Sequence, residues 1–100
     1  MIGVKIERAF EIFREEKSKE GYPSELIEKS LKFAEHYLNT ITSFLNGRHP
    51  ELVERAKVEM LPEALEFAER WIRGLSGLVG AEAKVKGKAY WEERIKEVVA

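Results

Sequence analysis

LPEALEFAERWIRGLSGLVG, residues 61–80, repeats apolar side chains at intervals of three and four residues. This period of about 3.6 residues predicts an amphipathic helix that buries one face in a core. Trp71 is in register with Ala68 and Leu75, so we expect its indole to lie in that core. The charged positions fall on the opposite side and predict a solvated acidic face made of Glu59, Glu63, Glu66 and Glu69.

Pro62 and three glycines mark the two ends of this segment. Proline lacks an N–H and clashes with the preceding turn, so a helix that begins near Pro50 either kinks at Pro62 or gives way to a new helix there. Gly74, Gly77 and Gly80 are spaced by three residues. No glycine is followed by Lys-Ser or Lys-Thr, and the stretch follows a helical pattern, which argues against phosphate and dinucleotide loops. We expect the helix to stop between Gly74 and Gly80, with a hinge or a close helix contact as alternatives.

Three further segments have helical periodicity, namely residues 2–20, 23–45 and 88–100. Gly21 is expected to end the first helix, whose last residues, EEKSKE (15–20), have the composition of a solvated end. Gly47 is expected to end the second in a left-handed conformation. The sequence predicts one all-α domain over residues 1–100, folded as an antiparallel four-helix bundle, or with five helices if Pro62 breaks the third.

Composition narrows the class of protein. All 18 acidic residues are Glu, there is no Asp, Gln or Cys, and the net charge is −1. Many ion-pairing and few thermolabile residues are typical of a thermophile. The absence of cysteine excludes disulfides and thiolate ligands. No apolar run approaches the ~20 residues needed to span a bilayer, and the first residues lack a signal-peptide pattern, so we expect a cytoplasmic protein with no membrane partner.

The side chains that usually carry catalysis or bind metals are scarce. His36 and His49 are the only imidazoles, and neither belongs to a His-Glu-x-x-His or Glu-x-x-His pattern. Both are expected to be exposed or to cap a helix. No serine has an oriented base beside it in a recognisable motif. We therefore predict a non-catalytic protein with no cofactor and no metal.

The charges are distributed unevenly along the chain. Residues 51–69 carry six Glu against two basic residues, a net charge of −4, whereas residues 84–96 carry five basic residues against two Glu, a net charge of +3. Three interpretations are open. In the first, the basic segment is solvated and Trp91 belongs to the core. In the second, the segment complements an acidic surface within the fold or across a dimer. In the third, it binds single-stranded nucleic acid through phosphate contacts and stacking. The nucleic-acid contacts would be Lys84, Lys86, Lys88, Trp91 and Arg94.

Two stretches, AEHYLNTITSFLNG (34–47) and PEALEFAERWIRGLSGLVG (62–80), resemble small archaeal helical domains that include HEPN-like ones. The resemblance implies a four-helix bundle that often dimerises. HEPN ribonucleases place four to six residues between an Arg and a His, whereas Arg48 here directly precedes His49. The resemblance therefore does not imply nuclease activity.

The chain has more large apolar side chains than four short helices are expected to bury. Uncovered aromatic area of this kind usually marks an interface, and twofold dimers are the commonest assembly. We predict an interaction or oligomerisation module that pairs with itself or with another protein, with a nucleic-acid-associated accessory domain as the alternative. Whether the last helix packs on its own chain or on the partner stays open. The candidate interface residues are Phe33, Tyr37, Phe44, Phe67, Tyr90 and Trp91.

Overall fold

The computed structural model describes residues 2–76 and 85–99, with side chains over residues 5–74 and 85–97. These residues form an all-α fold of six α-helices and one 3₁₀ turn, without a strand. The elements are α1 (Ile2–Lys19), α2 (Ser24–Ile41), α3 (Ser43–Asn46), η1 (Pro50–Leu52), α4 (Val53–Glu59), α5 (Leu61–Ser76) and α6 (Lys88–Val99). Within the described ranges, no helix is both long enough and apolar enough to cross a membrane.

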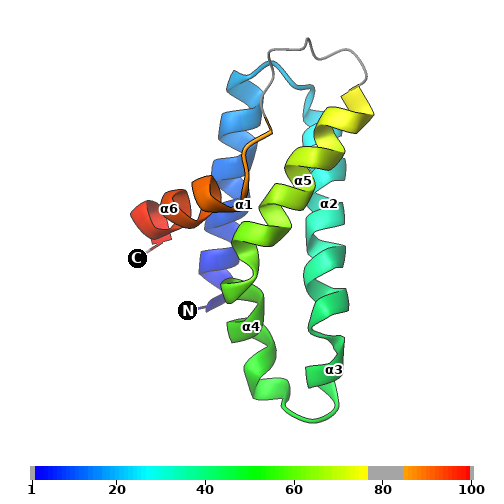
Figure 1. Cartoon of the computed structure of the whole chain (residues 1–100), viewed down its shortest axis with the longest axis vertical. Helices are drawn as coiled ribbons and strands as arrows, with labels where there is room; N and C mark the ends of the chain where they lie inside the picture. Colours follow the sequence, from blue (N-terminus) through cyan, green and yellow to red (C-terminus); the bar gives the residue numbers. More distant parts are fainter. Residues whose placement is uncertain (1, 77–84, 100) are drawn as a thin grey trace.

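The long helices α1, α2 and α5 lie side by side, and α5 is in front of α1 with α2 on one side and α6 on the other (Figure 1). α6 crosses α1 and α5 rather than running along them, and α3 and α4 continue the far end of the α2–α5 pair (Figure 1). The structure therefore does not confirm an antiparallel four-helix bundle. It does place the last helix on its own chain.

The turn between α1 and α2 follows the sequence prediction. Gly21 has φ +96°, a conformation that costs an L-residue with a side chain. Its N–H donates to the carbonyl of Ser18 and the N–H of Tyr22 donates to the carbonyl of Lys17. This pair of bonds is a Schellman motif, which satisfies carbonyls at the end of a helix. Gly21 therefore ends α1 as predicted.

The end of the second helical segment differs from its prediction. The apolar period continues to Leu45, but α2 ends at Ile41 and the short α3 follows Thr42. Thr42 is buried, and its hydroxyl donates to the carbonyl of Leu38 at 2.8 Å, which competes with regular helix bonding. Gly47 has φ −87°, so the predicted left-handed conformation at this glycine is wrong. The Thr42 hydroxyl therefore marks the end of α2, while α3 does stop before Gly47 as predicted, without the left-handed conformation.

Pro62 begins a new helix. α4 ends at Glu59, Met60 separates the two helices, and Pro62 stands in the first turn of α5, where its missing N–H has no helical partner to lose. This outcome decides between the kink and the break left open by the sequence. Gly77 and Gly80 lie outside the described residues, so the predicted helix stop across them is not described.

The core lies where α1, α2, α5 and α6 meet. Its fully enclosed side chains include Phe13 of α1, Leu38 of α2, Leu65 of α5 and Trp91 of α6. The predicted apolar period of α5 is confirmed by its buried residues Leu61, Ala64, Leu65, Ala68 and Ile72. The prediction that Trp71 is core is wrong, because 39% of it is exposed. It lies at the edge of the apolar stripe, where α2 covers only one side of it.

Candidate interaction surface

Four aromatic side chains form one continuous strip across α2 and α5, which we call the aromatic strip: Phe33, Tyr37, Phe67 and Trp71. The rings of Phe33 and Trp71 stack with centroids 4.2 Å apart and an interplanar angle of 15°. Tyr37 stacks on Phe67 at 5.3 Å, and Phe67 meets Trp71 edge-on at 6.0 Å. Arrangements of this kind add about 0.5–1.5 kcal/mol per pair beyond burial, so the strip is held rigidly in place.

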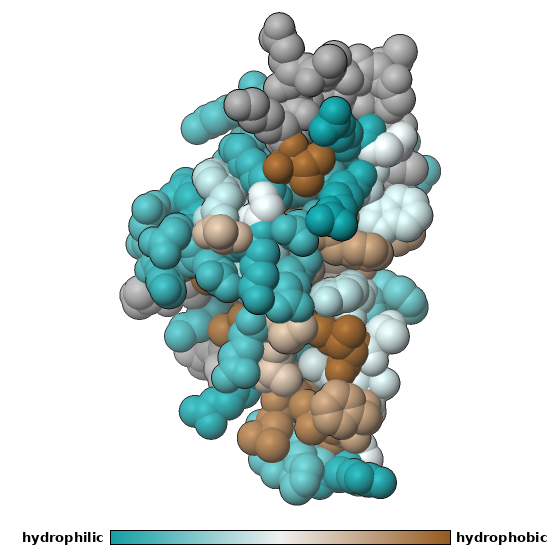
Figure 2. All heavy atoms as spheres, in the orientation of Figure 1, coloured by the Kyte–Doolittle hydropathy of each residue, from teal (hydrophilic) through white to brown (hydrophobic). Residues whose placement is uncertain are grey.

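Helical spacing explains how the strip forms. Phe33 and Tyr37 are four residues apart on α2, and Phe67 and Trp71 are four apart on α5, so each pair lies on one helix face. Both pairs flank the buried stripe of their own helix rather than belonging to it. In Figure 2, pale and brown side chains gather along the edge where α5 meets α2 and toward the end that holds α3 and α4. The strip is therefore a half-buried aromatic surface beside the core.

Charged groups line the strip on the α5 side. A groove of 340 Å³ is bounded by Tyr37, Glu63, Glu66, Phe67, Arg70 and Lys88. The Tyr37 hydroxyl donates to Glu63 at 3.4 Å. Burial, followed by the nearby Glu63 carboxylate, raises the pKa of the Tyr37 hydroxyl above its ordinary value. The strip thus combines aromatic faces with charged groups of both signs, namely the carboxylates of Glu63 and Glu66 and the cations of Arg70 and Lys88.

The six predicted interface residues do not form a single surface. Phe33, Tyr37 and Phe67 are brought together with Trp71, which the sequence assigned to the core. Phe44 is 70% exposed but lies on α3, where it lines a separate groove of 280 Å³ with residues of α4. Trp91 is fully buried, so its assignment as an interface or nucleic-acid contact is wrong.

The basic segment pairs with acidic side chains of its own chain. Lys86 lies 2.9 Å from Glu16, and Arg94 donates from Nε to the same carboxylate at 2.9 Å. Lys88 lies 3.0 Å from Glu63. Lys84 lies outside the described residues. Of the three interpretations, the contacts favour complementary packing within the fold. One acidic partner, Glu16, is on α1, and the other, Glu63, is on α5.

Glu66 receives the first amide of α6. Its carboxylate accepts a hydrogen bond from the Lys88 N–H at 2.7 Å, which places negative charge at the positive end of the helix dipole. A Cβ on Gly87 would lie 3.1 Å from the same carboxylate, so glycine permits this close approach. Glu66 therefore fixes where α6 begins on the surface of α5.

Two charged side chains predicted to be solvated are buried instead. Lys17, within the EEKSKE run, is 0% exposed, and Glu69 of α5 is 2% exposed. Their side chains pair at 2.6 Å. The Trp91 indole N–H donates to the second Glu69 oxygen at 3.1 Å, and Lys17 also contacts Glu20 at 3.0 Å. The predictions for Lys17 and Glu69 are wrong because the two side chains face each other between α1 and α5, with Trp91 of α6 against Glu69.

Glu16 joins α1 to α6. It accepts hydrogen bonds from the Tyr90 hydroxyl at 2.6 Å and from Lys86 and Arg94 at 2.9 Å each. Burial on its own would raise the pKa of the Glu16 carboxyl, but these three bonds outweigh it and the pKa is lowered. Burial raises the pKa of the Glu69 carboxyl, and the bond and charge of Lys17 offset only part of that rise. Tyr90 is thus tied into the fold through its hydroxyl, while 36% of the residue is exposed.

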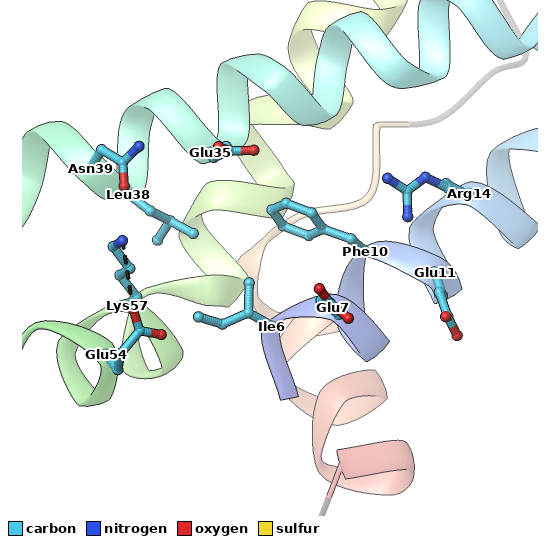
Figure 3. A pocket seen from close by; sticks show the side chains of 10 residues that line it. All are labelled: Ile6, Glu7, Phe10, Glu11, Arg14, Glu35, Leu38, Asn39, Glu54 and Lys57. Atoms are coloured by element: carbon cyan, nitrogen blue, oxygen red, sulfur yellow. Dashed lines mark ion pairs between the residues drawn. The ribbon is translucent and has the colours of Figure 1, made fainter. Parts of the chain in front are cut away.

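A larger groove lies on another side, between α1, α2 and α4. It has a volume of 560 Å³. Figure 3 shows Ile6, Phe10 and Leu38 pointing into it, with carboxylates around the rim. Two cations of the rim already have partners, because Arg14 donates twice to Glu28 and Lys57 lies 3.9 Å from Glu54. The groove therefore has an apolar floor with an acidic rim.

The His36 ring lies 3.5 Å from the Thr40 hydroxyl, and the His49 ring lies 3.5 Å from the Glu51 carboxylate. His36 and His49 are both exposed, as predicted. Among the described residues, no three His, Cys, Asp or Glu side chains are grouped so as to hold a metal ion. No family model, curated protein or solved structure matches this chain. The resemblance to HEPN-like helical domains therefore stays a prediction.

Proposed function

We propose that this chain is a non-catalytic helical module that associates with a second copy of itself through the aromatic strip. The observation that carries the proposal is the 39% exposure of Trp71 while its ring is stacked on Phe33. Exposing an ordered indole leaves apolar area in water, at roughly 25 cal/mol per Å². A partner that covers the strip recovers this free energy.

Two features of the strip support a protein partner. Its rings are already fixed against one another, so little side-chain entropy is lost on binding. Aromatic residues and Arg are the side chains that most often dominate protein interfaces, and Arg70 borders the strip. In a dimer of this kind, the α2–α5 pairs of two copies stack as a four-helix layer.

The nucleic-acid alternative has less support. It depends on Lys86, Lys88 and Arg94, whose charges are paired with Glu16 and Glu63, and on Trp91, whose ring is enclosed. Phosphate binding at this segment would have to displace carboxylates that the chain itself supplies. The α2–α5 side instead presents the partly exposed Trp71 and the exposed cation Arg70, whose one ion pair among the described residues is with Glu66.

Self-association is tested by light scattering over a dilution series from high to low micromolar concentration. We expect a mass of twice 11.6 kDa at high concentration and a return toward the monomer on dilution. Trp71→Ser is expected to shift the equilibrium to the monomer. Phe44→Ser is the matched control, because it removes another exposed aromatic ring that lies outside the strip.

The intrinsic fluorescence gives a second readout. The chain has two tryptophans, and Trp91 is already enclosed, so a change of emission on dilution reports Trp71. We expect the emission to move to longer wavelength as the dimer dissociates. A mass that stays at 11.6 kDa at every concentration overturns the proposal, as does a dimer that Trp71→Ser leaves intact.

A further inference from the structure

The outward side of α5 carries a second pattern beside the aromatic strip. Glu63, Phe67, Arg70 and Gly74 are spaced by four, three and four residues, which places them in one line along the helix. We call this line the α5 seam. The spacing equals that of the a and d positions along which two helices pack side by side. A helix that packs lengthwise on the outer side of α5 would follow this line.

The neighbours of α5 leave Arg70 and Gly74 of the seam exposed, whereas Tyr37 stacks on Phe67 and Lys88 pairs with Glu63. The buried residues Leu61, Leu65 and Ile72 lie on the opposite side of the helix. α2 flanks one edge, where Phe33 stacks on Trp71, and α6 flanks the other, where the Lys88 N–H meets Glu66. Figure 1 shows α5 in front, between these two helices.

Gly74 gives the seam a point of close approach. Glycine within a helix costs about 0.5–1 kcal/mol relative to alanine. Among the described residues, nothing lies within 4 Å of a Cβ added at Gly74, so packing against them does not account for glycine here. A second backbone that docked directly against this position would account for it.

We propose that the second copy docks its α5 antiparallel on this α5, across a twofold axis that passes between Phe67 and Arg70. The inference rests on the proposed self-association and adds its orientation and register. The axis places Arg70 of each copy against Phe67 of the other, and Gly74 of each copy against Glu63 of the other.

The charges of the seam favour this orientation. The Arg70 side chain is 70% exposed and its only ion pair along the described chain is a 3.5 Å contact with Glu66. In the antiparallel register its guanidinium meets an aromatic face, a cation–π contact of about 0.5–2 kcal/mol, with Glu66 of the other copy one residue away. A parallel pairing would set Arg70 against Arg70 and Glu63 against Glu63, which is repulsive.

Disulfide trapping tests the orientation directly, because the chain has no cysteine of its own. Glu63→Cys protein is mixed with Gly74→Cys protein, and each is also oxidised alone. The antiparallel register brings positions 63 and 74 of opposite copies together. Two copies of position 63 are separated along the axis by about 16 Å, from the helical rise of 1.5 Å per residue. We expect a disulfide only in the mixture.

A steric variant tests the close approach. Gly74→Leu has open space in the monomer and favours the helix, so we expect unchanged or greater thermal stability of the monomer and a dimer weakened by about tenfold or more. Gly47→Leu is the matched control, because Gly47 also has nothing within 4 Å and lies beyond the seam. It should leave the dimer constant unchanged.

The outcomes separate the two proposals. A chain that is monomeric in light scattering at every concentration removes the self-association and the seam together. A dimer in which each cysteine variant cross-links with itself is parallel, and overturns the seam register while self-association stands. If the Gly74→Leu and Gly47→Leu variants dimerise equally tightly, the seam is overturned while self-association stands.

Discussion

The ion pair between Lys17 and Glu69 is surrounded by core side chains, and every polar atom in it has a partner. Glu69 uses one oxygen for Lys17 and the other for the Trp91 indole. Lys17 also donates to both oxygens of Glu20. Moving charges out of water is costly, and it is tolerated when such bonds are complete. Removing one member leaves a buried charge without compensation.

Lys17→Met tests this residue. Methionine keeps most of the aliphatic length, so the main change is the lost charge opposite Glu69. We expect the free energy of unfolding at neutral pH to fall by about 3–5 kcal/mol, measured by urea denaturation. Arg8→Met is the control, because it breaks the exposed Arg8–Glu11 pair and should cost less than about 1 kcal/mol. Equal losses in the two variants would contradict the buried-pair account.

The sequence contains a signal for this buried pair, but amphipathic patterning alone does not distinguish it from charges on a solvated face. Lys17 is four residues after Phe13, and Glu69 is four after Leu65, so each charge stands in register with the apolar stripe of its helix. Trp71 is the opposite case, one residue from Ile72 yet at the edge of the stripe. How far a neighbouring helix covers such an edge depends on tertiary packing, which periodicity does not contain.

At the scale of elements, Gly21 and Gly47 form a natural comparison. Neither has an atom within 4 Å of an added Cβ, so only backbone conformation distinguishes them. Gly21→Ala is expected to destabilise by about 1–2 kcal/mol, because φ at this position is +96°. Gly47→Ala, at φ −87°, is expected to be neutral or to stabilise by up to about 1 kcal/mol. The shift of the urea midpoint measures both, and changes of the same sign would refute the distinction.

The ends of the elements show what local sequence can predict. Gly21 and Pro62 act through their own backbone chemistry: the end of α1 at Gly21 is confirmed, and the sequence placed either a kink or a new helix at Pro62. The break at Thr42 was missed because the apolar period runs through it without interruption. It depends on a buried hydroxyl bonding the carbonyl of Leu38. The hydroxyl of a solvated threonine could donate to water instead of to the Leu38 carbonyl. The break can therefore be predicted only when the burial of Thr42 is known.

At the scale of the whole molecule, Glu16 connects the beginning of the chain to its end. One of the three interpretations of the positive charge in residues 84–96 was an acidic partner surface, and the fold supplies one. Its main acceptor, Glu16, lies about 70 positions earlier in the chain than Lys86 and outside the acidic segment 51–69. Charge counting along the chain does not find such a partner, because only the crossing of α6 over α1 brings the two together.

Stability should depend on pH through this contact. The pKa of the Glu16 carboxyl is lowered from its ordinary value of 4.5, so the unfolded chain takes up a proton there more readily than the folded one. The contribution of Glu16 is therefore fully present above 4.5 and is lost as the pH falls through the lowered pKa. Glu69, whose pKa is raised, has the opposite sign, because its contribution is present at acid pH and lost as the pH rises.

Glu16→Gln isolates the first of these effects. Glu69 is kept in both proteins, so its dependence cancels in the difference between them. We expect wild type to exceed Glu16→Gln in free energy of unfolding most strongly at neutral pH, and the gap to close as the pH falls below 4.5, because protonated Glu16 is then close to a glutamine in charge. Urea denaturation across this pH range measures the gap. Glu93→Gln, which removes an exposed carboxylate 3.9 Å from Lys96, should show almost no gap at any pH. A Glu16 gap that is independent of pH would mean that α6 is held by packing around Trp91, and that the charges on Lys86 and Arg94 contribute nothing to holding it.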